Sequence, residues 1–227
     1  MALSKEHLLQ QCFGFLIFLL GSTVVVGWLI HAPMLVTFFP GSLPMVFNTG
    51  LSFVITGFAL SFPSAPNSWR QIVRTIAGIA LVALCSITFI EHLVDINFGI
   101  DLASLHAWLQ YGNVRPGRMA PNTALGFVVI GLALLLLDHV NTRGRAIGLL
   151  FLTCVLLAIG LTGLAGYALG PDLLFGWAVS ARMALHTASG MLLATIAIGF
   201  SWQQSDWYRS QTLLDEEQKS LFRALRC

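Results

Sequence analysis

The feature that most constrains this chain is the run between Glu6 and Arg70, which contains no Asp, Glu, Lys or Arg. Further uncharged stretches cover residues 75–90, 119–137, 146–171 and 183–205. About 20 apolar residues cross a bilayer, so most of these stretches are long enough to span one. Only 10% of the 227 residues are charged, against about 25% in a soluble domain. The sequence therefore predicts an all-α transmembrane protein in contact with the lipid bilayer.

The prolines divide the uncharged sequence into six expected helices. All eight prolines fall in connections or first turns, where a missing N–H costs no helical hydrogen bond. Six spans place both termini on the same side of the membrane. The predicted spans are residues 9–31, 44–62, 70–97, 119–139, 145–169 and 182–203.

Lysine and arginine positions orient the expected spans. The positive-inside rule assigns the more basic face to the cytoplasm, so the chain is expected in the inner membrane of a bacterium with both termini cytoplasmic. The outer connections are then residues 32–43, 98–118 and 170–181. On the cytoplasmic face lie Lys5, Arg70, Arg74, Arg143, Arg145, Arg209, Lys219, Arg223 and Arg226, against Arg115, Arg118 and Arg182 outside.

A short phrase recurs at the start of every second helix. Its copies are Met45-Val-Phe-Asn48-Thr49, Met119-Ala-Pro-Asn122-Thr123 and Met183-Ala-Leu-His186-Thr187. Repetition at a fixed period indicates one structural unit used several times. The sequence predicts three parallel helical-hairpin repeats, about 9–62, 70–139 and 145–203, related by an axis along the membrane normal as in some transporters. The third copy has histidine in place of asparagine, which makes His186 a candidate site residue.

Ionisable side chains within membrane spans are functional candidates by default, and here they gather at the outer end. Glu91, His92 and Asp95 lie in the last turns of the third expected helix, and Arg182 lies four residues before His186. Two outer connections also match, Gly99-Ile-Asp101 against Gly170-Pro-Asp172. The candidate ligand-binding residues are Glu91, His92, Asp95, Asp101, Arg118, Arg182, Asn48, Asn122 and His186.

Three interpretations of this cluster stay open on sequence alone. In the first, it binds a small polar ligand, helped by helix N-termini whose dipoles favour anions. In the second, His92 and His186 are axial ligands of a b-type haem, whose propionates pair with arginines. In the third, Asn48, Asn122 and His186 only bond connection carbonyls and hold the repeats together.

Several function classes receive no support from the sequence. The formal charge of +2 and the lack of a basic cluster argue against nucleic acid. The four cysteines form no CxxC pair, so neither a disulfide framework nor a zinc site is indicated. The hydrolase, metalloprotease and P-loop motifs are missing, and no catalysis is expected within this segment. A small transporter remains an alternative, although broken helices and midplane charges are missing.

The C-terminal residues 204–227 are predicted to form a charged cytoplasmic linker helix. Trp207, Leu214 and Leu221 recur at seven-residue spacing, with Leu225 next, which suits a parallel dimer helix. We expect a homodimer and an output domain beyond Cys227. Residues 1–203 would then be a six-span membrane sensor domain.

The outer motifs resemble a known kind of bacterial sequence. Pro116-Gly-Arg118-Met119-Ala-Pro-Asn122-Thr123-Ala-Leu-Gly-Phe127, Arg182-Met183-Ala-Leu-His186-Thr187-Ala, and Glu91 followed by Asn97-Phe-Gly-Ile-Asp101 look like the multi-pass N-terminal sensor region found ahead of PAS, histidine-kinase, GGDEF or EAL modules. The resemblance covers about residues 10–205. It implies an input domain that drives cytoplasmic kinase or cyclic-di-GMP output. His92 departs from the pattern, which has an aromatic residue after the glutamate, and His31 departs as well.

Overall fold

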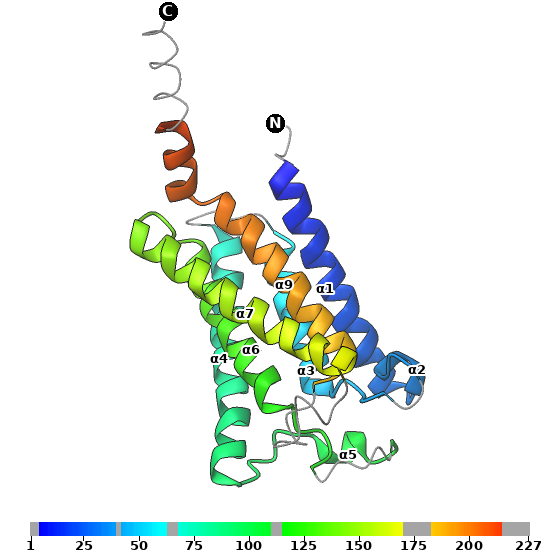
Figure 1. Ribbon diagram of the computed structural model, residues 1–227. Coiled ribbons are helices and arrows are strands. Elements are labelled where there is room, and N and C mark those ends of the chain that lie inside the picture. The colour runs from blue at the N-terminus through cyan, green and yellow to red at the C-terminus, as the bar shows by residue number, and fades with distance from the viewer. Residues whose placement is uncertain (1–4, 40–41, 63–67, 110–114, 170–182, 215–227) are drawn as a thin grey trace, which may run out of the picture.

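The computed structural model describes residues 5–39, 42–62, 68–109, 115–169 and 183–214, and all regular structure in these ranges is α-helical. The fold is all-α, as the sequence predicts (Figure 1). Residues 206–214 are also helical. The helices are α1 (Lys5–Leu29), α2 (Pro33–Val36), α3 (Phe47–Leu60), α4 (Trp69–Val94), α5 (Ala103–His106), α6 (Pro121–Leu137), α7 (Arg143–Leu169) and α9 (Leu185–Gln203).

Among the described residues, four helices are long and apolar enough to cross a membrane: α1, α4, α7 and α9. The six expected spans therefore reduce to four candidates, because α3 has 14 residues and α6 has 17. At 1.5 Å per residue these two are about 21 and 26 Å long, short of the roughly 30 Å hydrocarbon core. The expected helix 44–62 begins late, because residues 43–46 lack helical structure.

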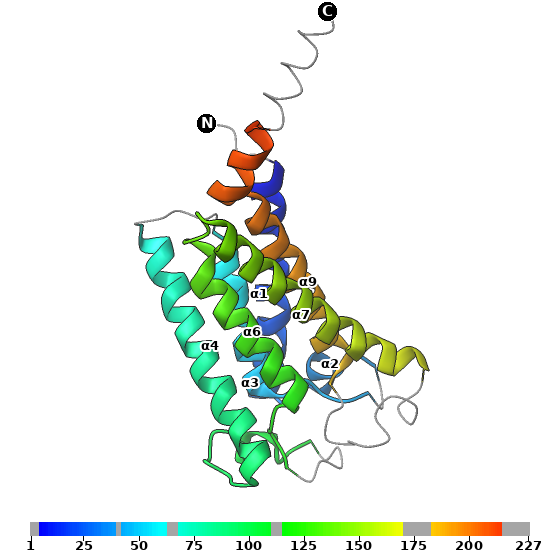
Figure 2. The same cartoon turned by 60° about the vertical axis from the view of Figure 1, so that its left-hand side comes forward.

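Both chain ends lie at one end of the bundle in the two cartoon views (Figures 1 and 2). The opposite end, called the distal end below, carries α2, α5 and the starts of α3, α6 and α9. The long helices α1, α4 and α7 run toward the distal end, and α3, α6 and α9 return from it. This course agrees with termini on a shared side.

The six long helices pack as an inner group of three and an outer group of three. The returning helices α3, α6 and α9 contact one another, and each of α1, α4 and α7 packs most extensively on the returning helix that follows it in the chain. Each outer helix also contacts a second returning helix: α1 contacts α9, α4 contacts α3, and α7 contacts α6. The returning helices therefore form the interior of the bundle, which fits their many buried residues.

Large side chains meet glycines where the returning helices cross. The Phe53 and Phe127 rings lie 4.8 Å apart between centroids. A Cβ on Gly190 would lie 2.5 Å from Phe53, and a Cβ on Gly126 would lie 2.9 Å from the Met191 methyl. Because small residues let helices approach closely in lipid, these contacts set the spacing of α3, α6 and α9.

Two glycines of α7, Gly160 and Gly163, pack against α9 and the residues just before it. A Cβ on Gly160 would lie 2.7 Å from Leu192, and one on Gly163 would lie 2.8 Å from the Met183 sulfur. Gly166 is buried as well, whereas Gly170 lies outside the described residues.

A buried ion pair fixes the end of the bundle near the termini, and the sequence analysis does not anticipate it. Arg74 of α4 pairs with Asp138, which follows α6, and both side chains are almost fully buried. Arg74 also donates to the carbonyls of Ala59 (3.4 Å) and Phe62 (2.8 Å). Gln10 of α1 donates to the Phe62 carbonyl too, at 3.0 Å. These side chains satisfy carbonyls that the end of α3 leaves without helical partners.

The helix of residues 206–214 extends beyond the bundle after a two-residue break (Figure 2). Trp207 is half-buried, and its backbone N–H donates to the Val140 carbonyl at 3.4 Å. Leu213 and Leu214 are 66% and 54% exposed. Leu221 and Leu225 of the expected dimer seam lie outside the described residues, so the dimer helix stays a prediction.

Candidate functional site

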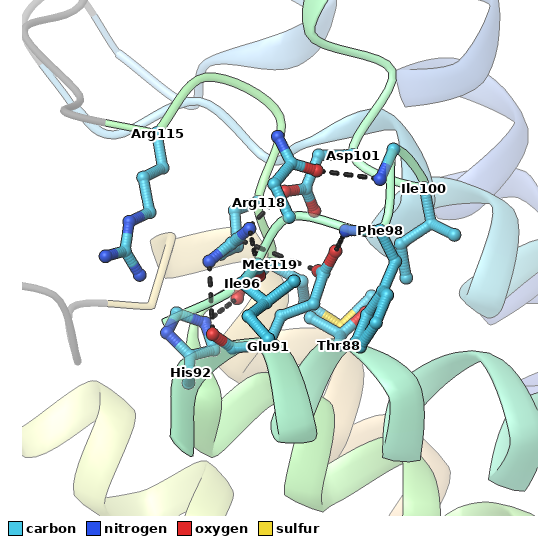
Figure 3. A network of polar contacts seen from close by, with 12 residues as sticks. Thr88, Glu91, His92, Ile96, Phe98, Ile100, Asp101, Arg115, Arg118 and Met119 are labelled. Atoms are coloured by element: carbon cyan, nitrogen blue, oxygen red, sulfur yellow. Dashed lines mark hydrogen bonds and ion pairs between the residues drawn. The ribbon is translucent and has the colours of Figure 1, made fainter. Parts of the chain in front are cut away.

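A buried polar cluster lies at the distal end, where the chain leaves α4 (Figure 3). Glu91 occupies the last turn of α4 and is completely buried. The helix ends at Asp95, whose φ of 56° is left-handed. The chain then folds back, so that Asp101 and Arg118 are only 3% and 5% exposed beside Glu91. We call Glu91, Asp101 and Arg118 the distal triad.

The Arg118 guanidinium is the centre of the triad. Its Nε donates to Asp101 Oδ2 at 2.8 Å and lies 3.7 Å from Glu91 Oε2. Its two terminal nitrogens donate to the backbone carbonyls of Glu91 (3.3 Å) and Ile96 (3.2 Å). Arg118 therefore ties the end of α4 to the residues that precede α6.

The triad holds more acceptors than donors. Glu91 Oε1 accepts the Phe98 N–H at 2.6 Å. Glu91 Oε2 and Asp101 Oδ1 are buried and accept no hydrogen bond from the described part of the chain. Two carboxyl groups thus share one guanidinium. Buried carboxylates are stable only when they are paired and hydrogen-bonded, so this site favours a further donor or positive group.

His92 makes a contact that recurs at the other two long helices. A polar side chain near the distal end of each long helix bonds the carbonyl of the methionine that opens a copy of the repeated phrase. The bonds are Trp28 Nε1 to Met45 O (2.7 Å), His92 Nε2 to Met119 O (2.8 Å) and Tyr167 Oη to Met183 O (2.9 Å). Because a carbonyl only accepts, each side chain donates. His92 therefore has a structural explanation that it shares with a tryptophan and a tyrosine.

The copies of the phrase also begin their helices in the same way. The residue after each methionine is the N-cap, in extended conformation, and the helix starts one residue later. These N-caps are Val46 (ψ 156°), Ala120 (ψ 146°) and Ala184 (ψ 147°). The asparagine or histidine of each copy consequently occupies the second helical position.

Asn48 and Asn122 make different contacts from that shared position. The Asn48 side-chain amide donates to the Ile100 carbonyl at 2.8 Å, so it joins α3 to the connection after α4. The Asn122 side-chain oxygen accepts the neighbouring Thr123 N–H at 2.9 Å. Asn48 thus acts as the stapling interpretation predicts.

His186, the exception in the repeat, is buried at the start of α9 with 6% of its surface exposed. Its imidazole faces the Val36 backbone. Neither ring nitrogen makes a well-formed hydrogen bond with the described residues. His186 therefore lies beside the connection between α1 and α3.

His106, which is not among the candidate residues predicted from the sequence, joins the connection after α4 to the start of α3. Its Nδ1 donates to the Leu102 carbonyl (2.9 Å), and its Nε2 accepts the Phe47 N–H (3.1 Å) at the start of α3. Burial lowers the pKa of His106, while the Leu102 carbonyl and the charge of Asp101 partly oppose that shift. The neutral form is favoured, which the acceptor role of Nε2 requires.

The structure brings Glu91, Asp101 and Arg118 together, keeps His92 beside Glu91, and places Asp95 on the surface. Asp95 forms an exposed ion pair with Arg115, and their side chains are 72% and 39% exposed. Figure 3 shows Arg115 apart from the triad. Arg182 lies outside the described residues. The triad had a sequence signal, because Asp101 and Arg118 match Asp172 and Arg182 of the next repeat. The spacing of these residues did not show that Asp101 and Arg118 pair with each other.

The histidine contacts do not favour a haem held by His92 and His186. His92 uses Nε2 to bond Met119, and His186 faces Val36. Among the described residues, no group of three or more His, Cys, Asp or Glu is placed to hold a metal ion. Haem binding stays a prediction, and visible spectra of the oxidised and reduced protein test it.

Comparisons with protein families, with curated proteins and with solved structures find no match to this chain. The class of protein is therefore judged from the fold. Its described residues contain four helices that are long and apolar enough to cross a bilayer, and the protein is a multi-pass helical membrane protein.

Proposed function

We propose that this chain is the membrane-embedded sensory input domain of a bacterial signalling protein. The observation that carries the proposal is the course of α9. This helix starts at the distal end, beside the connections, and is followed at the other end by helical residues 206–214, which lead away from the bundle (Figures 1 and 2). A change at the distal end can thus reach the opposite side of the membrane through one helix.

The proposed orientation places the distal end outside the cytoplasm. Arg70, Arg74, Arg143, Arg145 and Arg209 lie toward the end that holds the termini, and the described arginines at the distal end are Arg115 and Arg118. The positive-inside rule then puts the termini in the cytoplasm of a bacterium. In this proposal α3 and α6 also return the chain across the membrane, shielded from lipid by the longer helices.

The proposed architecture is a set of three hairpin repeats, α1 with α3, α4 with α6, and α7 with α9. The shared N-cap geometry and the three donors to methionine carbonyls support it. The order of contacts supports it too, since each outer helix touches its own partner and the returning helix of another pair. Because each outer helix contacts two returning helices, a shift of one helix would be passed to its neighbours, which suits a two-state switch.

The proposed ligand site is centred on the distal triad. Two buried carboxylate oxygens without a donor in the described residues favour a ligand group that donates hydrogen bonds or carries positive charge. The roles of His92, Asp95, Asn48, Asn122, Arg182 and His186 in ligand binding remain predictions. The contacts of His92 and Asn48 already have structural explanations.

The test follows the tail helix while the triad is changed. Ser210→Cys carries a spin label in a cysteine-free background, and pulsed EPR measures the distance between the labels of a dimer in lipid nanodiscs. The double variant Glu91→Gln/Asp101→Asn should shift the distance distribution, because it changes the charge that Arg118 balances. Arg115→Gln, at the exposed ion pair, is the matched control and should leave the distribution unchanged.

Identical distributions in all three proteins would refute the coupling between triad and tail. An absence of any distance between protomers would refute the dimer. In that case a second label at exposed Gly144 measures the tail within one chain and still decides the coupling.

A further inference from the structure

The connection between α1 and α3, residues 30–46, differs from an aqueous loop in its exposed side chains. We call it the apolar connection. It contains no charged residue. Large apolar side chains at and around α2 are exposed: Leu29 (61%), Ile30 (63%), Met34 (90%), Phe38 (65%) and Phe39 (46%). Large exposed apolar side chains that gather in one short segment mark an interaction site.

Several backbone N–H groups in the described part of the apolar connection have partners inside the chain. Pro33 and Pro44 have no N–H to satisfy. The Ser42 hydroxyl accepts from two consecutive residues, Phe38 and Phe39. Further donors are Ile30 to Val26 O (3.0 Å), Ala32 to Gly27 O (2.9 Å), Leu35 to Ala32 O (3.1 Å), Thr37 to Pro33 O (3.0 Å) and Met45 to Val36 O (2.8 Å). Backbone N–H and C=O groups outside helices need hydrogen-bond partners within the protein where no water is present.

The apolar connection also lies at a suitable depth. In Figures 1 and 2, α2 is beside the distal ends of α1 and α3, whereas α5 and the end of α4 lie further from the termini. Trp108 packs next to the connection, with its ring 5.1 Å from His31 and 5.2 Å from Trp28. The Trp108 indole nitrogen is buried, so this ring covers the protein-facing side of the connection.

We propose that the apolar connection is inserted in the bilayer leaflet at the distal end, where Met34, Phe38 and Phe39 contact lipid acyl chains. The occupant of this surface is the lipid itself, because the connection offers no charge for a polar partner and continues the lipid-facing surface of α1. The inner side of the connection meets the protein, since the Val36 side chain is fully buried near Gly27 and the Val36 backbone lies beside the His186 imidazole. Lipid packing in one leaflet therefore reaches the start of α9.

The experiment measures depth at single positions in nanodiscs. Nitroxide labels are placed at Met34→Cys and, as a matched exposed position in the connection after α4, at Asn97→Cys, with Cys12, Cys85, Cys154 and Cys227 replaced by alanine. Power-saturation EPR compares accessibility to oxygen, which concentrates in lipid, with accessibility to a water-soluble nickel chelate. Met34→Cys should favour oxygen, as Ile79→Cys on the exposed face of α4 does, and Asn97→Cys should favour nickel.

Equal nickel accessibility at Met34→Cys and Asn97→Cys would overturn the proposal. Dipolar broadening at Met34→Cys would also overturn it, because that result identifies a second copy of the chain as the occupant. If the cysteine-free protein fails to fold, Met34→Asp and Asn97→Asp in the native background decide instead. A charge in lipid is costly, so Met34→Asp should lower the melting temperature while Asn97→Asp leaves it unchanged; no difference refutes insertion.

Discussion

Two connections at the distal end, each described in part, satisfy the polar groups of their described residues in different ways. The connection between α4 and α6, residues 95–120, is charged and folds back onto the bundle through Arg118, Asp101 and Glu91. The apolar connection between α1 and α3 has no charge and satisfies its backbone locally, with Trp28 bonding the Met45 carbonyl. One connection depends on buried ion pairs and the other on short-range hydrogen bonds.

Similar helical hairpins carry different chemistry in these two connections. Trp28 and His92 donate equivalent hydrogen bonds, so the supporting contact is common to both hairpins. The preceding residue differs, being Gly27 in one and Glu91 in the other. Gly27 leaves room for Leu35 and Val36 to pack against α1, whereas Glu91 brings a carboxylate that needs Arg118. The residue just before the supporting donor, Gly27 or Glu91, thus distinguishes the apolar connection from the charged connection.

The largest expected effect comes from replacing Arg118, the centre of the charged connection. Arg118→Met leaves two buried carboxyl groups without their cation and should cost about 3–5 kcal/mol of stability. Unfolding in mixed micelles, followed by circular dichroism, measures the loss. Arg115→Met removes an exposed ion pair and should cost less than about 1 kcal/mol. The triple variant Glu91→Gln/Asp101→Asn/Arg118→Met should recover part of the lost stability. Equal losses for Arg118→Met and Arg115→Met would show that Arg118 does not hold the charged connection together.

A smaller effect is expected from two glycines of the same connection. Gly99 and Gly117 have φ values of 81° and 83°, so alanine at either position should cost about 1–2 kcal/mol. A Cβ on Gly117 would additionally lie 2.0 Å from the Asp101 carbonyl oxygen, while one on Gly99 would meet nothing within 4 Å. Thermal unfolding should therefore rank Gly117→Ala as clearly more destabilising than Gly99→Ala. The reverse order would show that the connection is not fixed at Gly117.

The donors to the methionine carbonyls test what the two connections share. Trp28→Phe, His92→Phe and Tyr167→Phe each remove one donor from a buried carbonyl and should cost about 1–2 kcal/mol. Similar losses are expected because the geometry is the same at the three sites. Unfolding in mixed micelles measures them side by side. A variant at one site that costs nothing would separate that hairpin from the other two.

The smallest effect is expected where the two connections meet. His106 of the charged connection accepts the Phe47 N–H just after the apolar one. Its pKa is lowered by burial, so its contribution to stability is complete above the unfolded pKa of about 6.5. It is lost as the pH falls through the lower folded value. Stability should therefore decline on acidification, and His106→Phe should weaken that decline; an unchanged profile would exclude His106 as the cause.

Much of the fold follows from local features of the sequence. The charge-free run after Glu6 and the proline positions predict where apolar helices lie, and the phrase beginning at Met119 predicts the start of α6 closely. The number of spans was less predictable, because hydropathy does not show that residues 43–46 leave the helical conformation. Periodicity also predicts that Gly160 and Gly163 face a neighbouring helix, since helical spacing alone places them on one side.

The candidate site was predictable as a collection of residues and not as a set of contacts. Glu91, Asp101 and Arg118 were among the candidates, but so were Asp95, which lies on the surface, and Asn48, which bonds a carbonyl. Residue spacing along one helix cannot report the path of a connection. The buried pair of Arg74 and Asp138 escaped notice for the same reason, because its partners are brought together only when α4 packs on α6.

Uncharged length and proline placement act locally and need no partner, so they predict without a structure that this protein is helical and lies in a membrane. The repeated phrase likewise predicts the common start of α3, α6 and α9. The pairing of Arg118 with Asp101, the bond of His92 to Met119 and the place of His186 beside Val36 became visible in the folded chain alone. These contacts depend on packing, because a buried donor takes its partner from whichever backbone the packing of helices brings within reach.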